Sequence, residues 1–250
     1  MTAARARPLA QKTIGILGGS SNEATVEYYQ ALNARLNAAY GGWDNAETVI
    51  VSVNFGNIEV FVRENRWEEL SAYLSAKIDR LESAGADLIV CVSNTLHRVV
   101  APLMARRRTH FIHIADPTGA AIRAAGLKKI GLLGTAPTMR SSELSAGFRD
   151  NYGFETISPD EADIEIVDRI IFDELVRRVL RPQSKAAYLD VVEKLRARGA
   201  QGVILGCTEI FLLIGQGDLP GFPVFDTTAL HVAAIADYVL AAPSRDAAPS

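Results

Sequence analysis

The chain has little cysteine, little net charge and no long apolar run. Its 250 residues contain two cysteines, Cys91 and Cys207, and carry a formal net charge of -3. Two distant cysteines provide neither a disulfide framework nor a paired-cysteine metal site. So small a charge does not attract nucleic acid or an anionic membrane surface. No stretch approaches the roughly 18 apolar residues of a membrane span, and the N-terminus lacks the apolar core of a signal peptide. We therefore expect a cytoplasmic protein that acts on small molecules, with no nucleic-acid or membrane partner.

Short, continuous apolar runs alternate with longer stretches of helical spacing. Runs of this kind are typical of parallel strands that helices cover on both faces, and the alternation predicts an α/β fold with doubly wound, mainly parallel sheets. The predicted strands are residues 13–18, 48–54, 87–93, 111–115, 129–134, 202–207 and 223–227.

The sequence contains an internal repeat of one unit. Residues 12–19 (KTIGILGG) align with residues 128–135 (KKIGLLGT), and residues 85–95 (GADLIVCVSNT) align with residues 199–209 (GAQGVILGCTE). An Ala-Tyr-Leu segment precedes the second motif in both halves, and the offset stays between 114 and 116 residues throughout. A repeat of this length identifies structurally equivalent positions. It predicts two pseudosymmetric α/β domains.

The domain boundaries follow from the repeat. We expect a first domain of residues 12–116 plus 220–240 and a second of residues 117–219. Residues 1–11 and 241–250 are expected to be flexible tails, because the last residues, AAPSRDAAPS, are small and polar.

The repeat places Ser93 on Cys207, each at a predicted strand end. Open parallel sheets bind ligands at this edge, so two facing domains would put both side chains on opposite walls of one cleft. A stereoinverting enzyme needs such a pair, because it removes a proton from one face of a carbon and returns one to the other. The predicted active site is therefore the cleft between the domains.

Cys207 is the candidate catalytic thiol. If a helix begins there, its N-terminus lowers the thiol pKa toward neutrality, and helix amides on both sides could hold a substrate carboxylate without a cofactor. The alternative is a buried small hydrophobe, and that alternative is our interpretation of Cys91, which lies inside its apolar run. Glu209 could position the thiol or a substrate ammonium, or could simply be favoured by a helix dipole.

Two glycine-rich loops and four histidines are further candidates. The loops could bind an anion through Ser21, Thr25, Thr135 and Thr138, or could be turns that these hydroxyls cap. Neither loop has the spacing of a dinucleotide fingerprint. His97 and His231 lie near predicted strand ends and could reach the cleft or pack, whereas His110 and His113 fit a structural role in an apolar strand.

Six motifs, in order, resemble the aspartate/glutamate racemase family: LGGSSNEATVEYY, SNTLH, HIAD, LGTAPTM, GCTEI and VFDTTALH. The resemblance extends from about Thr13 to Tyr238. It implies paired α/β domains, a homodimer, two catalytic cysteines, and neither pyridoxal phosphate nor a metal. By position, it implies the following site residues: Cys207, Thr208 and Glu209 in the second cysteine motif, Asn94 and Thr95 for the substrate carboxylate, and Thr135, with Ser20 and Asn22 where relatives have Met and Trp.

Ser93 replaces the first cysteine of the family pattern. A hydroxyl is a weaker acid than a thiol, and we expect Ser93 to transfer its proton less efficiently than Cys207 during racemisation of aspartate or glutamate. His97 completes the expected substrate-binding set. Two alternatives stay open: a one-cysteine decarboxylase or maleate-isomerase type of enzyme, and an amino-acid binding protein that has lost catalysis. The group that binds the distal carboxylate also stays open, and the candidates are Arg63, Arg66, Arg140 and Arg169.

Overall fold

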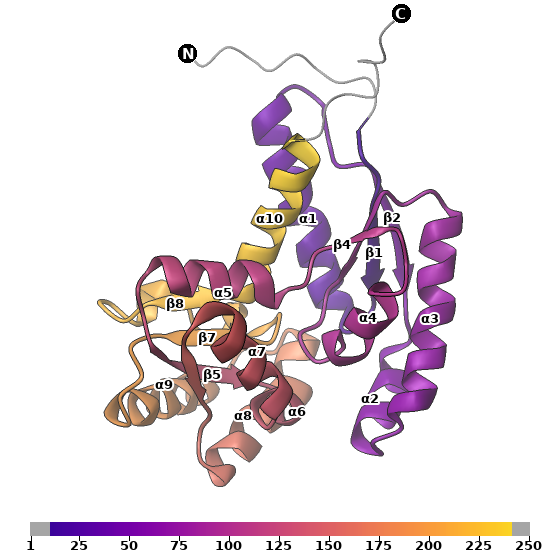
Figure 1. The fold of residues 1–250 in the computed structure, drawn as a ribbon. Helices are drawn as coiled ribbons and strands as arrows, with labels where there is room; N and C mark the ends of the chain where they lie inside the picture. Colours follow the sequence, from indigo (N-terminus) through magenta and orange to yellow (C-terminus); the bar gives the residue numbers. More distant parts are fainter. Residues whose placement is uncertain (1–10, 242–250) are drawn as a thin grey trace, which may run out of the picture. The chain divides into compact units, whose positions relative to one another are not determined.

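The computed structural model describes residues 11–241, which divide into two compact units (Figure 1). Unit 1 comprises residues 11–92, 96–113 and 231–241, and unit 2 comprises residues 93–95 and 114–230. Within these described residues, no helix has the length and apolar character needed to cross a membrane.

Unit 1 is built on a four-stranded parallel sheet with the order β2-β1-β3-β4. Helices follow most strands, as the alternation of apolar runs and helical stretches predicts. Its elements are β1 (Ile14–Gly18), α1 (Asn22–Tyr40), β2 (Thr48–Ser52), α2 (Phe55–Arg63), α3 (Trp67–Ser83), β3 (Leu88–Cys91), α4 (His97–Met104), β4 (His110–Phe111) and most of α10 (Thr227–Ala241).

Unit 2 repeats this topology in a parallel sheet with the order β6-β5-β7-β8. The matching strand orders confirm the prediction of two pseudosymmetric, doubly wound α/β domains. Its elements are α5 (Ala115–Ala124), β5 (Lys129–Gly134), α6 (Ala136–Met139), α7 (Ser142–Tyr152), β6 (Glu155–Ile157), α8 (Glu161–Asp173), η1 (Leu175–Arg177), α9 (Pro182–Ala197), β7 (Val203–Gly206), η2 (Ile210–Leu212), η3 (Gln216–Asp218), β8 (Val224–Asp226) and the start of α10.

The strand registers give a second, independent alignment of the two halves. Leu17 of β1 lies beside Cys91 of β3, and its repeat equivalent, Leu133 of β5, lies beside Leu205 of β7. Two residues beyond Cys91 and Leu205 are Ser93 and Cys207. The backbone pairing therefore supports the sequence alignment that makes Ser93 the counterpart of Cys207.

Alternate residues of β3 enter two different cores, as expected for a strand that is buried on both faces. Leu88 and Val90 pack with α1 and α10, whereas Ile89 and Cys91 pack with α2, α3 and α4. Cys91 has no exposed surface, which confirms its predicted place in the core.

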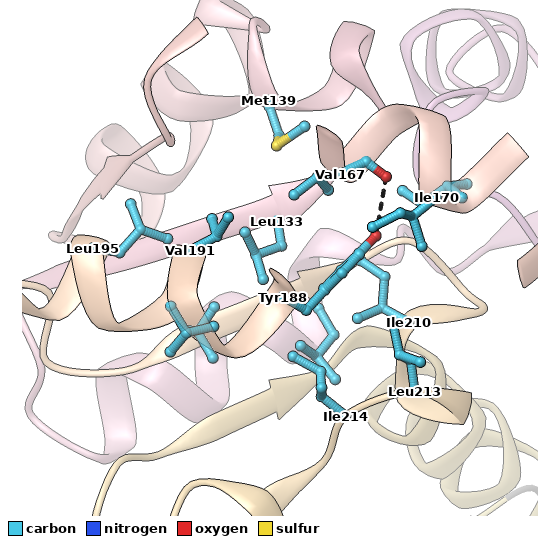
Figure 2. Close-up of a cluster of buried hydrophobic side chains, with 14 of the residues drawn as sticks. Leu133, Met139, Val167, Ile170, Tyr188, Val191, Leu195, Ile210, Leu213 and Ile214 are labelled. Carbon is cyan, nitrogen blue, oxygen red and sulfur yellow. Dashed lines mark hydrogen bonds between the residues drawn. The ribbon is translucent and has the colours of Figure 1, made fainter. Parts of the chain in front are cut away.

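Unit 2 also has an apolar core on each face of its sheet. One core lies under α5 and α7, and the other lies under α8 and α9. Figure 2 shows the second core, in which Leu133, Val191 and Ile210 surround the ring of Tyr188. The Tyr188 hydroxyl donates to the carbonyl oxygen of Val167 at 3.1 Å, which satisfies the one polar group of this buried side chain.

The structure corrects three parts of the predicted organisation. Strand β6 was not predicted, because its three residues are partly exposed and form no apolar run. Of the predicted strand 111–115, only Phe111 lies in a strand, the two-residue β4, and α5 already begins at Ala115. Residues 220–230 belong to unit 2 because β8 pairs with β7. Of the expected tails, residues 1–10 and 242–250 lie outside the described residues.

Candidate active site

The loop that follows β7 holds a thiol, a hydroxyl and a carboxylate in mutual contact. The Cys207 thiol and the Thr208 hydroxyl both donate to Oε2 of Glu209, each at 3.0 Å. Glu209 is only 3% exposed, and Thr208 only 2%. A buried carboxylate needs such donors, because its desolvation is otherwise unfavourable. The three residues therefore form one hydrogen-bonded unit at the strand end.

The environment of Cys207 raises its pKa, contrary to the expected lowering. Burial has the largest effect, and the negative charge of Glu209 adds to it. The expected helix does not begin at Cys207 either, because only the three-residue η2 follows it. A single 3-10 turn has too few aligned peptides to stabilise a thiolate. Burial and the Glu209 charge therefore favour the protonated thiol, which donates to the Glu209 carboxylate.

Residues Ser93–Thr95 belong to unit 2 although they follow β3 in the sequence. The Asn94 side-chain amide donates to the Thr227 hydroxyl at 3.0 Å, and that hydroxyl donates to the carbonyl oxygen of Leu205 at 2.8 Å. Leu205 is in β7, two residues before Cys207. The tripeptide that contains Ser93 is thus anchored beside the strand that presents Cys207.

Three threonine hydroxyls form a closed cluster at the end of β5. The distances between the Oγ1 atoms are 2.9 Å for Thr95 and Thr135, 3.1 Å for Thr95 and Thr138, and 3.1 Å for Thr135 and Thr138. Gly134 and Gly206, which directly precede Thr135 and Cys207, are paired in the sheet register. The cluster and the thiol therefore occupy neighbouring strand ends of unit 2, where parallel sheets bind ligands.

A protein carboxylate already occupies the first helical amide beside this cluster. The backbone N–H of Ala136, at the start of α6, donates to Oδ1 of Asp168 at 2.7 Å. The amides expected to bind a substrate carboxylate are therefore partly engaged. Neither Asp168, which lies within the periodic pattern of α8, nor the bridging role of Thr227 is predictable from a sequence motif.

The hydroxyls predicted in the first glycine-rich loop stabilise that loop itself. Ser21 caps α1 by accepting from the N–H of Ala24 at 3.3 Å. The Thr25 hydroxyl donates to the Ser21 carbonyl and accepts from the N–H of Gly19, both at 2.8 Å. Ser20 is also buried. These contacts match the capped-turn alternative for this loop.

Three histidines of unit 1, His97, His113 and His231, form an aromatic cluster. His97 is 3% exposed and contacts His113 and His231, at ring-centroid distances of 4.4 and 6.0 Å. His231 lies between the Tyr28 hydroxyl and the Ile112 carbonyl, each at 2.9 Å. Because a carbonyl only accepts, Nε2 of His231 donates to it and Nδ1 accepts from Tyr28. Burial lowers the pKa of His231 to about 4. These contacts give His97 and His231 a packing role, and the substrate-binding role of His97 stays a prediction.

The arginine candidates for a distal carboxylate have other partners or lie elsewhere. Arg63 pairs with Glu59, Arg66 with Glu64 and Glu69, and Arg140 with Glu161, all at exposed positions. Arg169 lines a separate pocket between α8 and α9. Across residues 11–241, no group of three or more His, Cys, Asp or Glu side chains is arranged to hold a metal ion.

Comparison with known proteins places these features in a family. A family model described as Asp/Glu/hydantoin racemase matches residues 16–235. The chain belongs to this family. Its fold is similar to that of a protein from Yersinia pestis described as a candidate Asp/Glu racemase, with 41% identity, a TM-score of 0.83, and coverage of 92% of this chain and 99% of that one.

Two other relatives agree with this family membership. An aspartate racemase homologue from Pyrococcus horikoshii is 33% identical, with a TM-score of 0.77 and coverage of 92% of this chain and 99% of that one. A glutamate racemase from Exiguobacterium sibiricum is 29% identical over 185 residues, which are 68% of this chain and 64% of that protein. The chain thus spans less than two thirds of the length of this curated relative.

Proposed function

We propose that this protein racemises an acidic amino acid, aspartate or glutamate, by proton transfer at the α-carbon without a cofactor. Cys207 acts on one face of the α-carbon and Ser93 on the other. The observation that carries the proposal is the hydrogen-bonded Cys207–Glu209 pair, located at the position that the repeat makes equivalent to Ser93. Family membership and the descriptions of the relatives support the reaction class.

Cys207 starts the proposed reaction as a protonated thiol and therefore acts first as an acid. When the Ser93 hydroxyl relays the α-proton to a water molecule, the electron pair stays on the α-carbon and spreads into the substrate carboxylate. The thiol then donates its proton to the opposite face, which leaves a thiolate and the inverted amino acid. In the opposite direction Cys207 first passes its proton to Glu209, at 3.0 Å, and then accepts the α-proton as a thiolate.

Ser93 is the weaker of the two groups. A serine hydroxyl does not ionise near neutral pH, so it transfers a proton between the α-carbon and water and does not hold a negative charge itself. The hydroxyls of Thr95, Thr135 and Thr138 and the amide of Asn94 are the proposed donors to the substrate carboxylate. They would stabilise the charge that develops there as the proton leaves.

The first experiment is incubation of the protein with L- and D-aspartate, L- and D-glutamate and other amino acids in deuterated buffer. The proposal predicts deuterium at the α-carbon together with formation of the other enantiomer, for aspartate or glutamate. A product other than the enantiomer would identify the one-cysteine lyase or isomerase. Binding without exchange would identify an amino-acid binding protein. Either result contradicts the proposal.

A further inference from the structure

A pocket in unit 2 lies between α8, the segment that follows it, and α9. It has a volume of about 480 Å³, within the range of pockets that bind small molecules. None of its lining residues belongs to the candidate active site. They are Ile166, Arg169, Ile170, Glu174, Arg181, Gln183, Ser184 and Ala187.

The floor of this pocket carries a buried charge. Glu174 is 9% exposed, and one of its carboxylate oxygens accepts from the Ser184 hydroxyl at 2.6 Å. Its other oxygen forms a long ion pair with Nη1 of Arg181, at 3.7 Å, which is beyond direct hydrogen-bond distance. A buried carboxylate with only one close donor is suited to a cationic ligand group.

The rim of the pocket has the opposite charge. Arg169 of α8 makes no ion pair among the described residues, and the guanidinium of Arg181 is mostly exposed. Arg181 is also the residue before α9, and no side chain within the described residues caps that helix. Guanidinium groups bind carboxylates through two parallel hydrogen bonds, and the positive end of a helix adds to the attraction.

The remaining wall is aliphatic and consists of Ile166, Ile170 and Ala187. A ligand that fits this pocket needs an anionic group for the rim, a cationic group for the floor and an apolar group for the wall. One kind of molecule carries all three. We infer that this pocket binds an aliphatic α-amino acid, with its carboxylate at Arg169 and Arg181, its ammonium at Glu174 and its side chain on the isoleucines. This site is distinct from the proposed acidic amino-acid site at Cys207.

The test uses three ligands with the same carbon skeleton, added to the full chain and followed residue by residue in amide NMR spectra. L-Leucine has both charges, 4-methylpentanoate lacks the ammonium, and 3-methylbutylamine lacks the carboxylate. We expect L-leucine to shift the amide signals of Gln183, Ser184 and Ala187 in a saturable way. Each analogue should bind at least about tenfold more weakly, because it leaves one protein charge unpaired. No saturable shift, or equal binding of either analogue, would overturn the inference.

The pocket variant combines Arg169→Gln with Arg181→Gln. The matched control is Arg177→Gln, which replaces an exposed arginine that does not line the pocket. The double variant should lose the L-leucine shifts, and the control should keep them. Both should retain the deuterium exchange of aspartate or glutamate that the wild type shows. Persistence of the shifts in a folded double variant would contradict the assignment. Because binding is read at α9 and exchange at the α-carbon, failure of one proposal is distinguishable from failure of the other.

Discussion

Glu209 contacts the one partly exposed thiol in the described structure, that of Cys207. Its carboxylate accepts from the thiol, and its charge raises the pKa of Cys207 in addition to the effect of burial. The same carboxylate is the nearest proton acceptor when Cys207 must become a thiolate. In the proposed mechanism Glu209 thus has two roles: it helps burial to keep the thiol protonated, and it accepts the proton when the thiol ionises.

Neutralising Glu209 should make the thiol ionise at lower pH. In Glu209→Gln we expect the pH profile of Cys207 alkylation by iodoacetamide to move to lower pH, because a raising influence on the pKa has been removed. Racemisation should nevertheless slow, since no carboxylate accepts the proton. Cys91 is fully buried and should not interfere. Glu161→Gln, at an exposed position of α8, is the control. An unchanged alkylation profile in Glu209→Gln would show that Glu209 does not influence the thiol.

A thiol at position 93 should accelerate the reaction. Ser93→Cys provides a stronger acid on the limiting face, and we expect kcat/KM to rise on the order of tenfold or more, within the range of general acid-base effects. The two enantiomers have equal free energies, so kcat/KM must rise by the same factor in both directions, while kcat and KM can change separately. Ser93→Thr, which keeps a hydroxyl, should stay close to the wild type. Unchanged rates in Ser93→Cys would mean that position 93 does not limit either direction.

At the scale of the elements, the end of β7 tolerates no side chain before Cys207. A Cβ on Gly206 would lie 2.6 Å from the Leu133 carbonyl oxygen of the neighbouring strand. Because the Gly206 backbone and the Leu133 carbonyl belong to paired strands, neither can move without disturbing the strand pairing.

Gly206→Ala should therefore destabilise unit 2 by about 1–3 kcal/mol, the usual cost of forcing extra volume into a packed region. Gly147→Ala is the matched control, because it lies within α7 and its Cβ would meet nothing within 4 Å. Alanine in place of glycine in a helix should stabilise by up to about 1 kcal/mol. Urea unfolding measures both changes. Equal stability of the two variants would contradict the tight approach of β5 and β7.

Most of the elements could be predicted because their apolar runs are continuous and their order repeats. The alignment of Ser93 with Cys207 was predicted correctly for the same reason, and the strand registers agree with it. The local electrostatics could not be predicted. A motif does not reveal that Glu209 turns back onto the thiol, that Asp168 reaches the start of α6, or that only a 3-10 turn follows Cys207. These features depend on side-chain direction and not on periodicity.

For the whole molecule, the buried His231 of unit 1 predicts a loss of stability in acid. The pKa of His231 is lowered to about 4 by burial, from an ordinary value near 6.5. Between these values the unfolded chain binds a proton that the folded chain does not, so the free energy of unfolding falls as the pH falls. At about 1.4 kcal/mol per pH unit over this interval, His231 contributes at most about 3.5 kcal/mol.

His231→Gln should reduce this pH dependence. We expect the difference in unfolding free energy between pH 6.5 and pH 4.5 to be smaller in His231→Gln than in the wild type, because the titrating group is absent. Tyr28→Phe, which removes the hydrogen-bond donor and keeps the titrating histidine, is the control. If the wild type and His231→Gln lose stability in parallel, His231 is not the group that responds to acid.

The proposed role of the Cys207 thiol as an acid and base is tested most directly by α-proton exchange in Cys207→Ala. In deuterated buffer, the wild type should incorporate deuterium at the α-carbon of aspartate or glutamate, and Cys91→Ala should do the same because Cys91 belongs to the core. Cys207→Ala should lose inversion and the exchange that depends on the Cys207 face. Undiminished exchange and inversion in Cys207→Ala would contradict the claim that Cys207 is an acid and base of this reaction.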